Sequence, residues 1–348
     1  YMIYLENHKD IAEDAKKRIL TTVVTDYIAK SEYTYDTSDP AYSQVINILY
    51  ENMKAENQIA KKEVETTAKP VETTVKNKKK RNKAIVPMPK KSGKLYTEKN
   101  IGSFKEVINR FYTVTNATTI KESDMPIKQA LNKEFKITGN NKKPQILIYH
   151  THSMEDFSNT TKDEDTTIIG VGNRLAQILR EQFGYNVIHD KTKYDIVNGK
   201  LDRHEAYTQS KAGVKKQLKK YPSISLILDI HRDGVNDGTR LVTEINGKKT
   251  AQIMFFNGMS RFKLSGDIDY LKNPYRFENL ALGLQMKVNA ECYYPGFTRR
   301  NYVNAYEYNL SLGKQCMLIE VGAQTNTYQE AKNAAEPLAV LIKKVLGE

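Results

Sequence analysis

Apolar and polar residues follow a repeating pattern from Pro144 to the end of the chain. Short apolar runs, typical of strands, alternate with longer segments whose apolar residues recur every three or four positions, as in helices. The short runs predict strands at 145–149, 186–189, 226–230, 251–257 and 317–321. The longer segments predict helices at 167–183, 209–220, 279–290 and 329–346. This alternation indicates an α/β domain, residues 144–348, with a twisted, mostly parallel sheet flanked by helices.

The part of the chain before the α/β domain is less regular. Residues 1–53 space their apolar positions near the helical period, which predicts a helical N-terminal segment. Residues 54–94 hold few apolar side chains and predict a disordered basic linker. Residues 95–143 carry helical patterns at 104–111 and 127–135. We expect this helical lead-in to pack on the main domain.

The positive charge of the chain is concentrated in the predicted linker. The formal net charge is +13, and residues 54–94 hold 13 Lys and Arg against four Glu, a charge of +9. Only +4 remains on the other 307 residues, so the sequence does not predict a nucleic-acid partner. Such a linker can lie against anionic membrane head groups or an anionic wall polymer, or it can serve as a solvated spacer.

The cysteines and the hydropathy leave two questions open. Cys292 and Cys316 can pair in an oxidising compartment or stay as two buried thiols. No apolar run approaches the roughly 20 residues that span a bilayer, and no signal peptide is visible. Because the sequence begins at Tyr1, without an initiator Met, a membrane anchor outside it is compatible with this pattern.

Residues suited to zinc chemistry follow the first apolar run of the α/β domain. Ligands of such sheets bind beyond the carboxyl ends of the strands. His152 and Glu155 lie there, and a His with a carboxylate three positions later can reach one ion from a turn. His150 can replace His152 as a ligand or support it as a hydrogen-bond donor. Glu164, in the loop before the next helix, is the rival of Glu155.

Two further runs end in residues that complete this site. His231 directly follows 226–230 and is the third predicted ligand, with Asp229 on the same face of the strand to orient its ring. Arg232 is permanently charged and suits a substrate carboxylate or the oxyanion formed during attack on an amide. Glu320 interrupts an apolar run, where a carboxylate is costly unless it is paired, metal-bound or catalytic. We therefore predict Glu320 as the general base of a zinc hydrolase.

Other catalytic classes find less support in the sequence. It contains no GxSxG, phosphate-binding loop or GxGxxG motif, and neither cysteine has a nearby His. The segment Gly170-Val171-Gly172 predicts close packing at a helix start. His189 and His204 have no carboxylate at ligand spacing, so we interpret them as packing residues.

Three segments carry a resemblance to a known family. They read YHTHSMEDF, YPSISLILDIHRDG and MLIEVGAQTNTYQEA, and with them residues 145–348 resemble the stage II sporulation protein P family. That family is similar to the zinc-dependent N-acetylmuramoyl-L-alanine amidases, which cut the bond between the lactyl group of the glycan and the peptide stem. Its members are also credited with endopeptidase activity on the stems. The resemblance therefore implies a fold like that of zinc amidases and carboxypeptidases.

The resemblance implies site residues as well. It implies Zn²⁺ as the cofactor, held by His152 and His231, with Glu320 as the catalytic carboxylate. The carboxylate ligand is less secure, and we rank Glu155 ahead of Glu164. Related amidases carry it just before the first helix, which favours Glu164, whereas the HxxE spacing favours Glu155, as in zinc carboxypeptidases.

A cellular role is implied too. It is that of a membrane-anchored, extracytoplasmic enzyme that degrades peptidoglycan at the sporulation septum during engulfment. The expected partners are the lytic transglycosylase, stage II sporulation protein D, and the membrane protein, stage II sporulation protein M. The N-terminal anchor of the family is missing from this sequence. Two other functions stay open: a zinc carboxypeptidase on free peptides, in which Arg232 holds the terminal carboxylate, and a non-catalytic scaffold that binds the cell wall.

Overall fold

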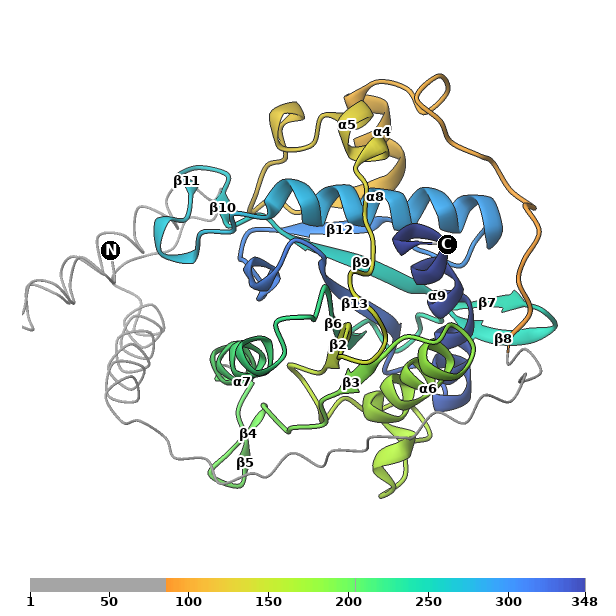
Figure 1. Ribbon diagram of the computed structural model, residues 1–348, viewed down its shortest axis with the longest axis vertical. Coiled ribbons are helices and arrows are strands. Elements are labelled where there is room, and N and C mark those ends of the chain that lie inside the picture. The colour runs from red at the N-terminus through yellow and green to blue at the C-terminus, as the bar shows by residue number, and fades with distance from the viewer. Residues whose placement is uncertain (1–85, 204, 348) are drawn as a thin grey trace, which may run out of the picture. The chain divides into compact units, whose positions relative to one another are not determined.

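A computed structural model describes residues 86–203 and 205–347 (Figure 1). The chain divides into two compact units, 1–75 and 76–348, and all described residues belong to the second. The predicted helical segment 1–53, most of the predicted linker and His204 lie outside the described residues.

A seven-stranded sheet, in the order β1-β12-β9-β13-β6-β2-β3, forms the centre of the described unit (Figure 1). Its strands are β1 (Tyr112–Val114), β2 (Ile146–Tyr149), β3 (Val187–His189), β6 (Leu226–Asp233), β9 (Ile253–Gly258), β12 (Asn301–Asn304) and β13 (Cys316–Ala323). Neighbouring strands run parallel except β9 and β13, which are antiparallel. The predicted α/β class with a mostly parallel sheet is thus confirmed.

Six α-helices and several short elements complete the described part of the chain. The helices are α4 (Phe104–Phe111), α5 (Ile127–Asn132), α6 (Ile168–Glu181), α7 (Ala206–Lys220), α8 (Arg276–Tyr293) and α9 (Tyr328–Leu346). Two-stranded ribbons are formed by β4 (Ile196–Val197) with β5 (Lys200–Leu201), β7 (Val242–Ile245) with β8 (Lys248–Ala251), and β10 (Arg261–Phe262) with β11 (Gly266–Asp267). Short 3₁₀ turns are η1 (Glu122–Asp124), η2 (Glu164–Thr166), η3 (Asp269–Leu271) and η4 (Leu310–Leu312).

Helix starts follow local capping rules. Ser103 and Glu106 form a capping box at the start of α4, and Thr327 and Glu330 form one at the start of α9. In each box the hydroxyl accepts a backbone N–H of the first turn while the Glu accepts the N–H of the cap residue, which satisfies two donors that the helix leaves unpaired. Thr167 caps α6 through its hydroxyl.

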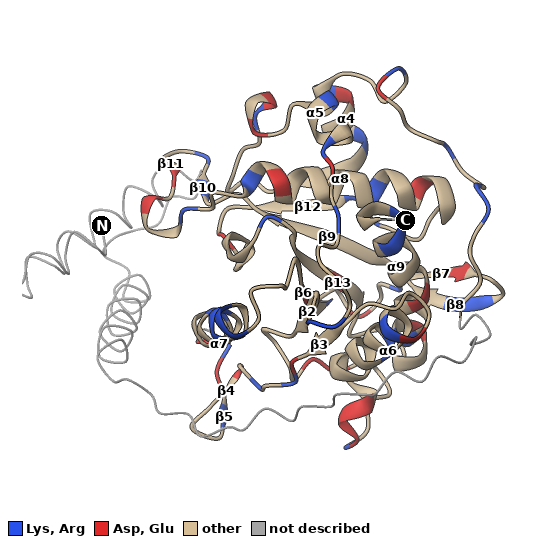
Figure 2. Cartoon of the chain, viewed as in Figure 1, with Lys and Arg blue, Asp and Glu red and all other residues tan. Residues whose placement is uncertain are grey.

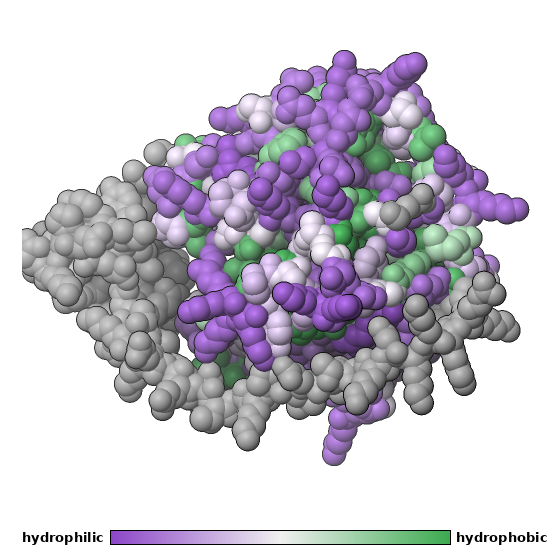
Figure 3. Space-filling view, viewed as in Figure 1, coloured by the Kyte–Doolittle hydropathy of each residue, from purple (hydrophilic) through white to green (hydrophobic). Residues whose placement is uncertain are grey.

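The two faces of the sheet are covered differently. Ile146, Leu228 and Ile319 belong to the core with α6, α8 and α9, whereas Leu147 and Leu318 belong to a smaller cluster with α7. Polar residues cover the outer sides of the helices, and apolar residues show between them (Figure 3). Because successive strand side chains point to opposite faces, the even positions of β13 and the odd positions of β6 lie on the α7 face.

The outer side of α7 is basic (Figure 2). This helix carries five Lys and no Asp or Glu. The net charge of +4 outside the linker does not reveal this basic helix, because Asp and Glu residues elsewhere offset the charge of its lysines. A folded basic surface therefore exists in addition to the predicted linker.

The last residues of the predicted linker are packed onto the domain. Val86 is 2 % exposed, and its N–H donates to Gln182 Oε1 at 2.7 Å. The N–H groups of Ser92 and Gly93 donate to the carbonyl of Cys292 at 3.0 and 2.9 Å. The packed part of the chain therefore begins no later than Val86, ahead of the predicted boundary at 95. Val86, an apolar residue in a segment rich in Lys and Pro, anchors this segment to the domain.

The structure bears on the state of the two cysteines and on membrane-spanning segments. Cys292 and Cys316 are buried free thiols, and burial raises the pKa of Cys316 well above its ordinary value. Among the described residues, no helix is both long and apolar enough to span a bilayer.

Candidate active site

The carboxyl ends of three adjacent strands, β2, β6 and β13, open into one pocket of about 280 Å³. The chain leaves β2 towards β3 on one side and later enters β6 on the other, so a topological switch point, where α/β sheets bind ligands, lies between β2 and β6. Five predicted side chains line this pocket: His152, Glu155, His231, Arg232 and Glu320. Residues up to 168 positions apart in the sequence therefore meet in one place.

His231 is held by a buried carboxylate. Its Nε2 lies 2.9 Å from Asp229 Oδ1, as the period-two spacing predicts. Asp229 also accepts the N–H and the hydroxyl of Thr151 at 2.9 and 2.6 Å, which fixes the turn after β2. Burial opposes a charge on His231, but Asp229, Glu155 and Glu320 outweigh burial and raise its pKa to about 10. Without a metal, a protonated His231 thus neutralises part of a cluster of carboxylates, and a cation bound at this ring would take the place of the proton.

His152 lies against aromatic rings. Its ring centroid is 5.3 Å from that of His231 and 5.5 Å from that of Tyr207, both at nearly right angles. Burial, and then the charge of His231, lower the pKa of His152 to about 4. Its Nδ1 is buried and has no hydrogen-bond partner among the described residues. A neutral imidazole with an unused nitrogen is what a metal ligand requires.

Glu155 lies close to the ring of His231 and to the backbone N–H of the next residue of β6. Its Oε2 is 4.0 Å from His231 Nδ1 and accepts the backbone N–H of Arg232 at 2.7 Å. Burial raises the pKa of this carboxyl, against the opposing charges of His231 and Arg232. The hydrogen bond fixes one oxygen of Glu155 at the carboxyl end of β6.

Glu320 has the features of a carboxyl tuned for proton transfer. Burial, together with the negative charges of Glu155, Asp233 and Asp229 and against the pull of His231, raises its pKa to about 8. Its Oε2 is buried without a hydrogen-bond partner among the described residues. Strongly shifted carboxyls in a pocket are typical of catalytic acids and bases.

The two alternative ligands do not line the pocket. His150 is fully buried; its Nδ1 donates to the carbonyl of Ile230 at 2.7 Å and its Nε2 lies 2.9 Å from Nε2 of His189. Glu164 lies in η2 and forms an ion pair with Lys193 at 3.1 Å. The turn after β2 brings Glu155 into the pocket instead.

The residues of the pocket suit a divalent cation, although their side chains do not stand in a ready coordination shell. Across residues 86–203 and 205–347, no three His, Cys, Asp or Glu side chains are arranged to hold a metal ion as they stand. Two observations nevertheless fit such an ion. His152 Nδ1 and Glu320 Oε2 are buried polar atoms without partners, which is costly unless something binds them. Several carboxylates also surround two imidazoles, a donor set suited to zinc.

Other pocket residues were not expected from the sequence. Tyr207 stacks on His231 at a centroid distance of 6.5 Å, and Arg203, Phe256 and Tyr308 form further walls. Tyr207 belongs to the first turn of α7, Phe256 to β9, and Arg203 and Tyr308 to turns, and none of them is a charged or His residue that follows an apolar run. A motif search at strand ends could not find them.

The turn after β2 has a second support that the sequence did not reveal. Asp195 accepts the hydroxyl of Ser153 and, at 3.0 Å, the N–H of Met154. This carboxylate comes from the segment before β4, far from any predicted motif. The turn that carries His152 is thus held by Asp229 on one side and by Asp195 on the other.

Comparison with known proteins gives three findings. Residues 16–343 match the family described as Stage II sporulation protein P (SpoIIP). Stage II sporulation protein P of Bacillus subtilis (strain 168) is 27 % identical over 213 residues, which is 57 % of this chain and 50 % of that relative. The chain thus matches about half the length of this relative.

A solved structure, the N-acetylmuramoyl-L-alanine amidase from Clostridium difficile 630, matches 57 % of this chain and 95 % of its own, with 14 % identity and a TM-score of 0.31. A likeness this distant adds nothing to the argument from the sheet topology. The family match, by contrast, spans nearly the whole sequence and confirms the resemblance seen in the three motif segments. This chain belongs to the stage II sporulation protein P family.

Proposed function

We propose that this protein is a zinc-dependent peptidoglycan hydrolase that acts as an N-acetylmuramoyl-L-alanine amidase. The observation that carries the proposal is the meeting of His152, Glu155, His231 and Glu320 around one pocket. Membership of a sporulation family supports septal peptidoglycan, degraded during engulfment, as the substrate. Endopeptidase activity, which cuts a bond within the peptide stems, is an alternative that uses the same zinc chemistry.

In this proposal His152, Glu155 and His231 hold the zinc ion. When bound, zinc supplies Lewis-acid chemistry: it polarises the substrate carbonyl and makes water a better nucleophile near neutral pH. Asp229, 2.9 Å from His231 Nε2, orients that ring and leaves Nδ1 to face the pocket.

Glu320 moves the proton. Its carboxylate takes a proton from the attacking water and delivers it to the nitrogen of the breaking amide, which leaves as the free amine of the peptide stem. The carboxyl must hold the proton between these two events. The pKa of about 8, raised mainly by burial, suits this holding role, and a nearby cation would favour the ionised form that starts the cycle.

Two arginines suit the charge of the substrate. Arg203 and Arg232 line the pocket, and peptide stems carry carboxylates. Arg232 Nη1 donates to the carbonyl of Asp233 at 3.2 Å, which keeps the guanidinium at the pocket edge. We assign these side chains to binding of the stem, and Arg232 additionally to stabilising the oxyanion.

Product analysis tests the proposal. The zinc-loaded chain is incubated with purified peptidoglycan and the soluble products are identified by mass spectrometry. We expect free peptide stems that begin with L-alanine, and a loss of roughly 10²–10⁴-fold in rate for Glu320→Gln, the range for a general base. Stems cut internally would show an endopeptidase instead, and no difference between wild type and Glu320→Gln would refute the hydrolase.

The Arg203 and Arg232 pair also favours a second candidate, a zinc carboxypeptidase that acts on free peptides. Arg232 would then hold the terminal carboxylate of the peptide. Turnover of short peptides without glycan separates this candidate from the amidase. A non-catalytic wall scaffold would bind peptidoglycan equally well with Glu320→Gln and would release nothing.

The proposal extends to location and partners. We place the enzyme on the extracytoplasmic face of the membrane at the septum, tethered by a membrane anchor, with stage II sporulation proteins D and M as partners. Family membership supports this placement. Co-purification of the three proteins from sporulating cells tests it.

A further inference from the structure

Within the part of the chain that the structure describes, the α7 face of the sheet is covered on one side of the pocket and open on the other. A row of paired residues crosses this face from β2 to β1: Tyr149, Asp229, Leu318, Phe256, Tyr302 and Thr113. The first three are buried, the next two are half-buried and the last is exposed. A large substrate bound over the pocket therefore has room to extend over β9 and β12, and α7 blocks the other direction.

Aromatic rings lead from the pocket onto this open side. Tyr308 lies 5.7 Å from Tyr207 and 4.6 Å from Phe256, measured between ring centroids, and all three line the pocket. Tyr306 is 6.4 Å from Tyr308 and 5.4 Å from Phe262, and it is 49 % exposed. An unbroken series of ring contacts thus connects the pocket to the molecular surface.

The loop that carries Tyr306 and Tyr308 is fixed in place. Glu307 is buried and accepts two bonds from Lys211 Nζ, at 2.7 and 2.9 Å. Asn309 Nδ2 donates to the carbonyl of Tyr207 at 3.1 Å. Tyr308 and Asn309 both have left-handed backbone, with φ of 52° and 57°, a strain that persists only where surrounding contacts enforce it. Rings held this way are preorganised for contact with a ligand.

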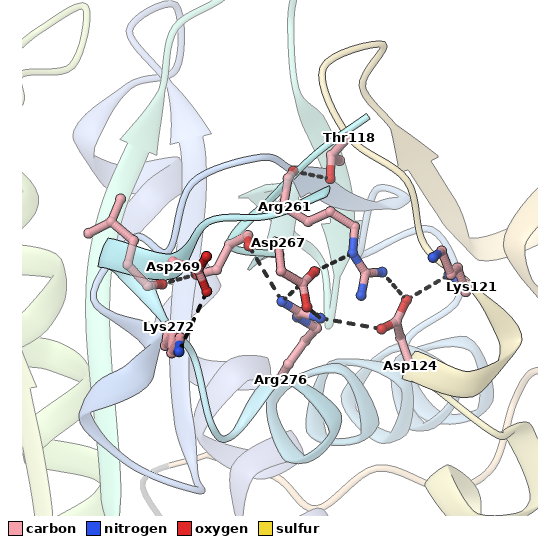
Figure 4. A network of polar contacts seen from close by, with 10 residues as sticks. Thr118, Lys121, Asp124, Arg261, Asp267, Asp269, Lys272 and Arg276 are labelled. Carbon is pink, nitrogen blue, oxygen red and sulfur yellow. Dashed lines mark hydrogen bonds and ion pairs between the residues drawn. The ribbon is translucent and has the colours of Figure 1, made fainter. Parts of the chain in front are cut away.

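The hairpin that carries Phe262 is anchored separately (Figure 4). Arg261 bonds to Asp124 and, through Nε at 2.6 Å, to Asp267, while Arg276 reaches Asp267 at 3.2 Å. Asp124 and Arg261 have side chains only 8 % and 9 % exposed, so their ion pair joins η1 to the hairpin in a sheltered place. The pair of Arg276 with Asp267 joins the hairpin to α8. Phe262 is therefore held beside Tyr306.

We propose that Phe262, Tyr302 and Tyr306 form a sugar-binding subsite, the aromatic platform, for the glycan strand next to the cleaved amide. The proposal rests on the proposed function and adds the direction in which the substrate lies. Sugar rings present an apolar C–H face that packs on aromatic rings, and their hydroxyl and amide groups suit a polar neighbour such as the exposed Thr113. The charged stem suits the arginine end of the pocket instead.

Binding of peptide-free glycan tests the aromatic platform. The probe is a glycan oligomer of alternating N-acetylglucosamine and N-acetylmuramic acid, titrated calorimetrically into the full chain carrying Glu320→Gln. We expect Tyr306→Ala to weaken binding roughly tenfold, the scale of one lost aromatic contact. Tyr306→Phe keeps the ring and should bind like the parent. Tyr293→Ala, on α8 at the opposite face of the sheet, is the matched control.

The outcomes separate the aromatic platform from the proposed function. If the parent does not bind the glycan, or Tyr306→Ala binds it unchanged with an intact fold by thermal melting, the aromatic platform is wrong. If Tyr306→Ala instead loses affinity for a free stem peptide, the open side belongs to the stem and the proposal is also wrong. Glycan binding that depends on Tyr306, in a wild-type chain that releases no products from peptidoglycan, would support the aromatic platform and reject the hydrolase.

Discussion

His150, which is fully buried, and His189, which is half-buried, face each other beside the pocket. Because a carbonyl can only accept, His150 Nδ1 donates to Ile230, which leaves His150 Nε2 without a proton, 2.9 Å from Nε2 of His189. On its other side, His189 Nδ1 lies 3.0 Å from Asn173 Oδ1. Burial lowers the pKa of His150 to about 4, and burial together with the charge of His150 lowers that of His189 well below its ordinary value. The pair therefore serves the packing of β2 against β3.

Acid should destabilise the fold through this pair. An unfolded chain takes up a proton at His150 near pH 6.5, whereas the folded chain does so only near pH 4. Stability is therefore fully present above pH 6.5 and is lost as the pH falls from 6.5 towards 4, by roughly 3 kcal/mol for this group. Urea unfolding at pH 7.5, 6.5, 5.5 and 4.5 measures the loss.

The variant His150→Asn isolates the effect. Asn keeps a donor for the carbonyl of Ile230 but removes the titrating ring. We expect lower stability at pH 7.5 and a flatter decline towards pH 4.5. An equally steep decline in the variant would mean that other groups cause the acid sensitivity.

At the level of elements, α6 starts in a space that only glycine fits. A Cβ at Gly170 would lie 2.6 Å from the backbone carbon of Asp165, and one at Gly172 would lie 2.7 Å from His150 Nε2. The sequence prediction of close packing at this helix start agrees with these distances. Both neighbours are fixed, one by η2 and the other by its buried hydrogen bonds.

Gly170→Ala should destabilise the domain. Ala is the better helix former by about 1 kcal/mol, but the collision with the backbone of η2 costs about 1–3 kcal/mol and outweighs that gain. Thermal unfolding should show a lower midpoint for Gly170→Ala and no change for Gly238→Ala, where a Cβ meets nothing within 4 Å. A Gly170→Ala midpoint at or above the wild-type value would contradict this packing.

Elements were predictable where the apolar signal was long. All five predicted strands are present, because each is a mainly apolar run that lies largely buried in the sheet. β1 and β12 were missed because polar residues break their apolar pattern: Thr113 in the middle of β1, and Asn301 and Asn304 at the ends of β12. The antiparallel direction of β9 was also not predictable, since periodicity within a strand says nothing about its partner.

On the scale of the whole molecule, strand order determines what the pocket contains. The predicted His152, Glu155, His231 and Glu320 meet because β2, β6 and β13 are parallel neighbours, so their carboxyl ends share one edge. The walls from β9 and β12 were not predictable, because those strands enter from the opposite direction and contribute side chains from their middle or far end. The sequence therefore predicted the chemistry of the site better than its shape.

The central claim is that three strand ends assemble one zinc site, and zinc titration tests it most directly. Calorimetry of the metal-free full chain should give one Zn²⁺ per chain, with binding lost in His152→Ala and in His231→Ala. His189→Asn, at a histidine outside the pocket, should bind zinc like wild type. Wild type that binds no zinc, or a double variant His152→Ala/His231→Ala that binds it as tightly as wild type, would contradict the account.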